Sequence, residues 1–178
     1  TIENQLNIGI RAFELSVANY EEYVFLGDNV DRGLYTYARQ ATGMANRYCA
    51  LSDIFDAFKT FLSSNATKDE AVVVVINHYT ETTSEILSTG FAAKMKTFLE
   101  GYRCVTESDL ANLTLRDCRG KILVLSRDTY DNGPIGAYVS SYTHQAQLQT
   151  GTIYIGTTTV PLDVQYYYHG GSSFSEEK

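Results

Sequence analysis

Hydrophobic residues in the first two thirds of the chain fall into runs that predict three strands. Apolar and polar positions alternate within Ile10–Val17, which places Glu14 on the face opposite Phe13. Ala71–Ile76 is an unbroken, mostly β-branched run, and Lys121–Ser126 is a second apolar run. Such runs are typical of central strands in a parallel sheet, and we expect them to be covered on both faces.

Apolar positions spaced three and four residues apart predict two helices. Leu51–Leu62 carries such a stripe, with Ser52 as its predicted N-cap. A second helix is predicted over Thr83–Glu100 and ends at Gly101. A short helical segment is predicted over Glu107–Leu115. Strands and helices therefore alternate along the chain.

The remaining segments are polar or rich in Gly, Thr and Tyr. Asn19–Gln40 predicts a long loop with a hairpin, and short strands are predicted at Thr152–Ile155 and Asp163–Tyr168. The order strand, loop, helix, strand, helix, strand indicates an α/β layer or barrel. We expect a single domain over residues 1–178, in which residues 128–178 form a Tyr-, Thr- and Gly-rich C-terminal part.

The composition fits a folded domain and narrows the classes of partner. Of the 178 residues, 44% are hydrophobic and 20% are charged, which excludes a disordered or low-complexity protein. The net charge of -7 disfavours nucleic acids and anionic membranes and favours a neutral ligand, a cation or another protein. No apolar run nears the roughly 18–20 residues that cross a bilayer, so no transmembrane segment is predicted. Thr1 in place of Met indicates a processed chain.

The cysteines and the glycosylation sequons bear on whether the protein is secreted. Cys104 and Cys118 could pair across the segment between them, leaving Cys49 free or bonded elsewhere, and buried reduced thiols are the alternative. Without a CxxC motif or a Cys/His cluster, zinc is not predicted. Asn65 and Asn112 each begin an Asn-x-Thr sequon, and we expect glycosylation there if the chain is secreted.

Polar side chains follow the three predicted strands. Ligands of parallel α/β folds bind beyond the carboxyl ends of the strands, so these positions are candidates for a site. These residues could also have a structural role. Glu14 could pair with a neighbouring Arg, and Arg127 with Asp128 or Asp131. His78 could be a hydrogen-bonded loop residue. The residues at the strand ends are Glu14 and Ser16, Asn77 and His78, and Arg127 and Asp128.

Motifs of common enzyme classes are absent from the sequence. GxGxxG, the P-loop, GxSxG and HExxH do not occur. A Ser–His–Asp triad is not supported, because His144 and His169 lie in the C-terminal part. The run Tyr166–Tyr168 is interpreted as strand packing or as an aromatic contact surface. No cofactor is predicted.

Several segments resemble the X-type domain of phosphatidylinositol-specific phospholipase C. Gln5–Leu15 reads QLNIGIRAFEL and resembles the family's QLnxGIRxxDlR strand, and Leu51–Leu62 matches the helix that follows it. Asn65–Ile76 resembles the NPsEvvil strand, and Leu115–Arg127 resembles the RGKIvLlkR element. This order of four elements implies a TIM-type β/α barrel, partial or distorted, of the PLC-like phosphodiesterase kind.

The family's enzymes cleave phosphodiesters with two histidines as general base and acid, and with an Arg or a calcium ion at the phosphate. The resemblance places Glu14 at the acidic position of the first strand and Ser16 where the family has Arg. Thr42 stands where the second histidine precedes a Gly, and threonine cannot move a proton near neutral pH. Ile76 stands where calcium-dependent members have Glu, so most calcium ligands are lacking and no metal site is predicted. Arg127 matches a residue that contacts the inositol headgroup in bacterial members.

The resemblance therefore implies a scaffold that lacks its acid–base pair. We expect a catalytically degenerate domain, a pseudoenzyme, that acts as a binding or assembly module for an inositol- or sugar-like ligand. The alternative is an active phosphodiesterase with Glu14 and His78 as catalytic residues and Asn77 and Arg127 at the substrate. An absent N-terminal segment or a partner chain would then supply the missing groups.

Length and family also suggest partners and location. A closed barrel takes roughly 200–250 residues, so we expect another chain or like subunits to complete this one. Many family members are secreted or surface-associated, and a secreted or cell-surface location is expected here.

Overall fold

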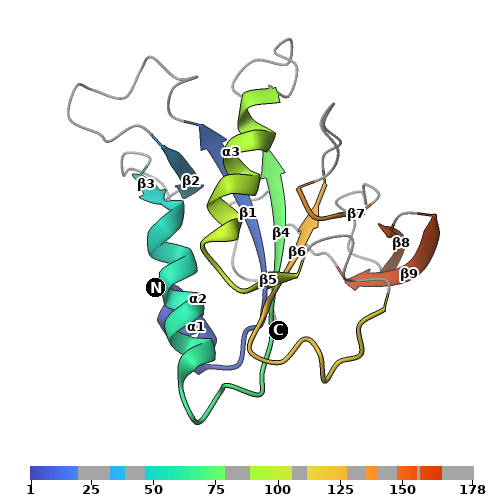
Figure 1. The fold of residues 1–178 in the computed structure, drawn as a ribbon, viewed down its shortest axis with the longest axis horizontal. Coiled ribbons are helices and arrows are strands. Elements are labelled where there is room, and N and C mark those ends of the chain that lie inside the picture. The colour runs from blue at the N-terminus through green and yellow to red at the C-terminus, as the bar shows by residue number, and fades with distance from the viewer. Residues whose placement is uncertain are drawn as a thin grey trace, which may run out of the picture.

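A computed structural model describes residues 1–19, 33–38, 47–78, 89–105, 112–127, 135–139, 148–155 and 157–165. Within these ranges, nine strands form one sheet in the order β3-β2-β1-β4-β6-β7-β8-β9, with β5 paired to β6 (Figure 1). The strands are β1 Ala12–Asn19, β2 Leu34–Ala38, β3 Arg47–Ala50, β4 Val72–His78, β5 Cys104–Val105, β6 Ile122–Ser126, β7 Ala137–Val139, β8 Leu148–Ile155 and β9 Thr158–Gln165. The helices are α1 Ile2–Asn7, α2 Leu51–Ser63 and α3 Thr89–Glu100.

The centre of the sheet is parallel and its two sides are antiparallel. β1 pairs with β4, β4 with β6, and β6 with β5 and β7, all in parallel. β2 and β3 extend the sheet beyond β1, and β8 and β9 extend it beyond β7, by antiparallel pairing. The predicted α/β class is confirmed. In the described part of the chain the sheet does not close into a barrel, because β3 and β9 end it on opposite sides.

The main core lies between the sheet and the helix layer formed by α2 and α3. Phe55 and Phe58 of α2 and Phe91 of α3 are fully buried in one apolar cluster with residues of β1, β4 and β6. The ring centroids of Phe58 and Phe13 lie 5.0 Å apart, and those of Phe55 and Phe98 lie 5.1 Å apart. Burying each large apolar side chain stabilises the fold by about 1.5–3 kcal/mol, so these rings fix both helices against the sheet.

β4 is covered unequally on its two faces. Val72, Val74 and Ile76 have no exposed surface beneath the helix layer. Val73 and Val75 point to the other face and are half-buried. The prediction that this run is covered on both faces is therefore correct only for the helix face. The half-buried valines pack on a smaller cluster of Leu125, Ala137 and Val139, against which Ile153 and Ile155 also lie.

The long hydrophobic runs gave correct predictions. The predicted strands at Ile10–Val17, Ala71–Ile76, Lys121–Ser126 and Thr152–Ile155 are confirmed as β1, β4, β6 and β8, and the helix over Leu51–Leu62 is confirmed as α2. The second predicted helix is α3, whose described part begins at Thr89, while residues 83–88 lie outside the described ranges.

The N-cap prediction for α2 is wrong. The cap is Ala50, which has an extended backbone and makes no side-chain capping hydrogen bond. Ser52 is instead the second residue of the helix. β3 runs directly into α2 without a loop, so the cap position falls on Ala50, the last residue of the strand.

Three segment predictions need correction. The segment Asn19–Gln40, predicted as a long loop with a hairpin, contains the strand β2, which pairs antiparallel with β1 and β3, while residues 20–32 and 39–40 lie outside the described ranges. Residues 112–115 are turn or irregular rather than helical, and 107–111 lie outside the described ranges. β9 begins at Thr158 rather than Asp163, because an edge strand accommodates Pro161. The short elements α1, β3, β5 and β7 were not predicted.

Candidate functional site

Four of the predicted site residues lie on one face of the sheet. Neighbouring residues of a parallel pair in register point to the same side. Ser16 is in register with Asn77, and Glu14 with Val75, which is itself in register with Leu125. We call this side, opposite the helix layer, the inner face; it carries Glu14, Ser16, Asn77 and, two residues after Leu125, Arg127.

Arg127 and Glu14 form an ion pair that spans β4. Nη1 of Arg127 donates to Oε1 of Glu14 at 2.8 Å, although 113 residues separate them in the chain. Their side chains are 17% and 26% exposed, so the pair is partly shielded from water. The backbone N–H of Arg127 donates to the carbonyl of Ile76 at 3.0 Å and extends the ladder past β6. Glu14 therefore does pair with an Arg, which is the structural role considered for it. The alternative partners considered for Arg127, Asp128 and Asp131, lie outside the described ranges.

His78 lies on the opposite face of the sheet. It is in register with the fully buried Val17 and is itself 8% exposed. Its ring stacks on Phe91 of α3, with centroids 3.8 Å apart and planes at 20°. The sheet therefore separates His78 from Glu14, the other residue predicted to be catalytic.

The positions at which this chain differs from the phospholipase family lie on both faces of the sheet. Ser16 lies on the inner face beside Asn77. Ile76 is fully buried under the helix layer, in register with Ser126. A carboxylate at position 76 would therefore face the helices and not the inner face. Thr42 lies outside the described residues.

All three cysteines are thiols in the structure, so the considered bond between Cys104 and Cys118 is not formed. Burial raises the pKa of Cys104 to about 12, which keeps this thiol protonated and unreactive near neutral pH. Burial, followed by the nearby carboxylates of Asp53 and Glu3, raises the pKa of Cys49. The raised pKa values disfavour the nucleophilic thiolate at Cys49 and Cys104 near neutral pH.

The two sequon asparagines lie on the surface. Asn65 and Asn112 are exposed and lie in turns at the amino ends of β4 and β6. Their location is compatible with a glycan, and glycosylation stays a prediction.

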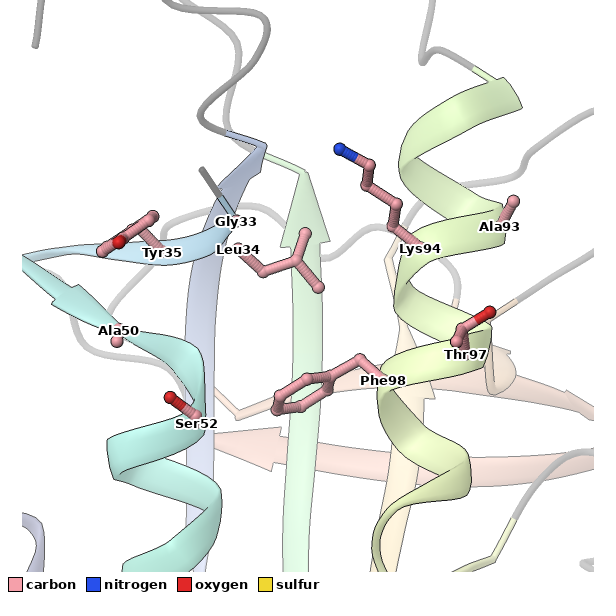
Figure 2. Close-up of a pocket in the computed structure, with 9 residues that line it drawn as sticks. All are labelled: Gly33, Leu34, Tyr35, Ala50, Ser52, Ala93, Lys94, Thr97 and Phe98. Carbon is pink, nitrogen blue, oxygen red and sulfur yellow. The ribbon is translucent and has the colours of Figure 1, made fainter. Parts of the chain in front are cut away.

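A groove on the helix side was not predicted. It has a volume of about 660 Å³ and lies between β2, the start of α2, and α3 (Figure 2). We call it the helix-side groove. No single segment of the sequence signals it, because its walls come from three elements that are far apart in the chain. The residues on its walls include Leu34, Ala50, Ser52, Lys94, Thr97 and Phe98.

The described ranges contain no group of three or more His, Cys, Asp and Glu side chains placed to hold a metal ion. Within the same ranges, no helix has the length and apolar character needed to span a membrane. Within the described ranges, the inner face carries the predicted polar side chains, and the helix-side groove is the largest of the cavities described for this part of the chain.

Comparison with protein-family models gives no match, and comparison with curated proteins gives none either. Among solved structures, the chain is similar to a phosphatidylinositol-specific phospholipase C of S. aureus, with a TM-score of 0.58 and 16% sequence identity. The likeness covers 95% of this chain and 53% of that one, so this chain spans about half the length of the enzyme. At this identity the likeness concerns the fold. The chain thus has an α/β fold like that of this phospholipase C, with a sheet that does not close in its described part.

Proposed function

We propose that this chain is a phospholipase C-like domain that acts as a binding or assembly module rather than as a phosphodiesterase. The observation that carries the proposal is the ion pair between Arg127 and Glu14. A guanidinium held by a carboxylate of the same chain is already compensated in charge. It therefore attracts a phosphodiester less than an uncompensated Arg would.

The chemistry of the inner face supports the same conclusion. Acid–base cleavage of a phosphodiester needs side chains that exchange protons near neutral pH. Among the residues that the structure describes, the inner face offers a hydroxyl from Ser16, an amide from Asn77 and the paired charges of Glu14 and Arg127. These groups suit hydrogen bonds to a neutral polyol, so we infer an inositol- or sugar-like ligand.

The test measures turnover and binding side by side. The chain is incubated with phosphatidylinositol vesicles and with inositol 1,2-cyclic phosphate, and soluble inositol phosphates are quantified. We expect no release above buffer, together with calorimetric binding of myo-inositol that weakens in Asn77→Ala. Arg119→Met, a change on the exposed surface, is the matched control. Turnover that disappears in Arg127→Met would contradict the proposal.

We further propose that another chain or a like subunit completes the sheet. This is supported by the half-buried apolar side chains of the inner face and by the separate ends of the sheet. Light scattering after size-exclusion chromatography should give a particle mass well above the 19.9 kDa of one chain. A stable, soluble monomer would exclude this part of the proposal.

A second candidate is an active phosphodiesterase. In its favour, Glu14, Ser16, Asn77 and Arg127 share the inner face. Asn77 and Arg127 lie at the carboxyl ends of β4 and β6, where ligands of parallel α/β folds bind, whereas Glu14 and Ser16 lie within β1. A segment outside this chain or a partner would supply the missing acid or base. If turnover is found, a rate unchanged in His78→Ala would exclude His78 as a catalytic residue.

Secretion and glycosylation belong to the same proposal. The exposed turns that carry Asn65 and Asn112 support it. The intact mass of the native protein, measured before and after deglycosylation and reduction, tests both points. A mass that deglycosylation does not lower would exclude glycans at either asparagine.

A further inference from the structure

The helix-side groove has the dimensions and walls of a site for a small molecule. Its volume of about 660 Å³ falls within the roughly 300–1,000 Å³ usual for ligand pockets. Leu34 of β2 and Phe98 of α3 point toward each other across it (Figure 2), which gives it an apolar interior. Ligand sites are mostly apolar with a small number of placed polar groups, and this groove follows that pattern.

One charged side chain stands among the described residues that line the groove. It is Lys94, whose ammonium group reaches toward the upper rim in Figure 2. Nζ of Lys94 donates to Oδ1 of Asn19 at 3.1 Å, and Asn19 is only 4% exposed. This bond to a buried, neutral amide holds the ammonium at the rim.

The start of α2 also contributes positive electrostatic potential to the groove. Ala50 and Ser52 line the groove on either side of the first helical residue, Leu51. Ala50 makes no side-chain capping hydrogen bond, and the first amides of a helix carry partial positive charge. In its described part, the groove therefore joins an apolar interior to the ammonium group of Lys94 and the first amides of α2.

We propose that the helix-side groove binds a small amphiphile with an anionic head, such as a medium-chain carboxylate. The tail lies between Leu34 and Phe98, and the head accepts a hydrogen bond from Nζ of Lys94. This inference does not rest on the function proposed for the inner face, because the helix layer and the sheet separate the two.

A head-group series on the unmodified chain provides the first test. Dodecanoate, dodecan-1-ol and dodecylamine share one tail and differ in charge, and each is titrated below its micelle concentration at physiological salt. Displacement of a fluorescent anilinonaphthalene sulfonate reports binding. We expect saturable binding of one dodecanoate per chain, about tenfold tighter than dodecanol, with dodecylamine weaker still. Equal affinities for the acid and the alcohol, or no saturable binding, would overturn the proposal.

Variants assign the binding to the groove. Lys94→Met should weaken dodecanoate binding about tenfold and leave dodecanol unchanged. Leu34→Ser should weaken the binding of both dodecanoate and dodecanol. Lys96→Met, on the same helix but outside the groove, is the matched control. Dodecanoate binding unchanged in Lys94→Met would overturn the proposal; if that variant does not fold, the head-group series decides.

Arg127→Met keeps this proposal separate from the previous one. It alters the inner face and should leave dodecanoate binding intact. A loss of dodecanoate binding in this variant would show that the ligand occupies the inner face, and the groove proposal would then be wrong.

Discussion

At the scale of single residues, close backbone contact makes some positions intolerant of even one added atom. Gly136 is such a position, since a Cβ added there would lie 2.2 Å from the carbonyl oxygen of Val124 and 2.6 Å from its carbonyl carbon. Both atoms belong to the backbone of β6 and cannot rotate away. Only glycine lets the segment before β7 lie this close to β6.

Gly136→Ala should therefore destabilise the fold by about 1–3 kcal/mol, the usual cost of overpacking a core. Urea unfolding followed by circular dichroism measures it. Gly33→Ala is the control, because a Cβ there would meet only a ring carbon of Tyr35 at 3.9 Å. Equal unfolding midpoints for the two variants would contradict this account of Gly136.

Arg11 shows how one side chain can join several elements. Its Nη1 donates to the carbonyl of Leu6 at 2.6 Å, its Nε donates to Glu70, and its guanidinium lies 4.4 Å from the ring centre of Phe61. The hydrogen bond from Arg11 is the main cause that holds the pKa of Glu70 below its ordinary value of 4.5. A lowered pKa means that the folded state favours the carboxylate.

The pair should thus contribute stability above about pH 4.5, and this contribution is lost as the pH falls through the lowered pKa of Glu70. We expect Glu70→Gln to flatten the acid limb of the stability profile and to have no effect once Glu70 is protonated. Solvent screening of this half-exposed pair limits the effect at pH 7 to about 0.2–1 kcal/mol. Unfolding midpoints between pH 2 and 7 measure it. The control is Asp69→Asn, which removes an exposed carboxylate 3.9 Å from Arg119.

At the scale of elements, an aromatic cluster fastens α2 to α3. The ring of Phe55 lies 5.6 Å from Phe58, 5.1 Å from Phe98 and 5.2 Å from Tyr102, and Phe55 has no exposed surface. Truncating such a side chain removes contacts in two helices at once and leaves a cavity between them.

Phe55→Ala should destabilise the protein by about 3–5 kcal/mol. Phe61→Ala on the same helix is the matched control, and it should cost clearly less because Phe61 is only half-buried. Both values come from urea unfolding at one pH. Similar losses of unfolding free energy in the two variants would show that burial does not determine how much each Phe of this helix contributes to stability.

Pro161 affects the hydrogen bonding of β9, the last described strand of the sheet. Ile155 and Thr158 pair at the tip of the β8–β9 hairpin with two residues between them, and in such hairpins hydrogen-bonded and non-hydrogen-bonded pairs alternate from the tip. Thr152 and Pro161 then form a non-hydrogen-bonded pair, so the proline nitrogen faces the edge of β9 that is unpaired among the described strands. Pro161 breaks no bond to β8 and removes one donor from that edge, which hinders the addition of a further strand. We expect a partner to meet this chain away from β9.

At the scale of the whole molecule, the ion pair between Glu14 and Arg127 connects β1 to β6 across β4. It joins parts of the chain that no local signal relates. If it acts as a connection, the two side chains must be energetically coupled. Removing one should deprive the other of this ion pair.

A double-mutant cycle with Glu14→Gln and Arg127→Met tests this coupling. Each single variant should lower the stability, and the double variant should cost about 1 kcal/mol less than the sum of the two. Urea unfolding at pH 7 gives all four values. Additive losses would mean that the pair is a surface contact without energetic coupling, and the proposal for the inner face would lose its main support.

Elements with a local signal could be predicted from the sequence. The alternation around Phe13, the β-branched run before Asn77 and the stripe of α2 follow periods of 2 and 3.6 residues, which depend on backbone geometry and burial alone. Asn77 and Arg127 at the ends of β4 and β6 could be found in the same way, whereas Glu14 and Ser16 lie within β1 and not at its end. Short strands such as β2 and β7 could not, because pairing with distant strands stabilises them more than their own composition does.

The tertiary structure alone decided what those elements do together. Alternation puts Asn77 and His78 on opposite faces, but only the packing of Ile76 under the helix layer decides which of the two reaches the inner face. The contact between Glu14 and Arg127 depends on the register of three strands, and the helix-side groove on the approach of β2, α2 and α3. The physical reason is that register and helix docking arise from long-range contacts, whereas periodicity arises within a few residues.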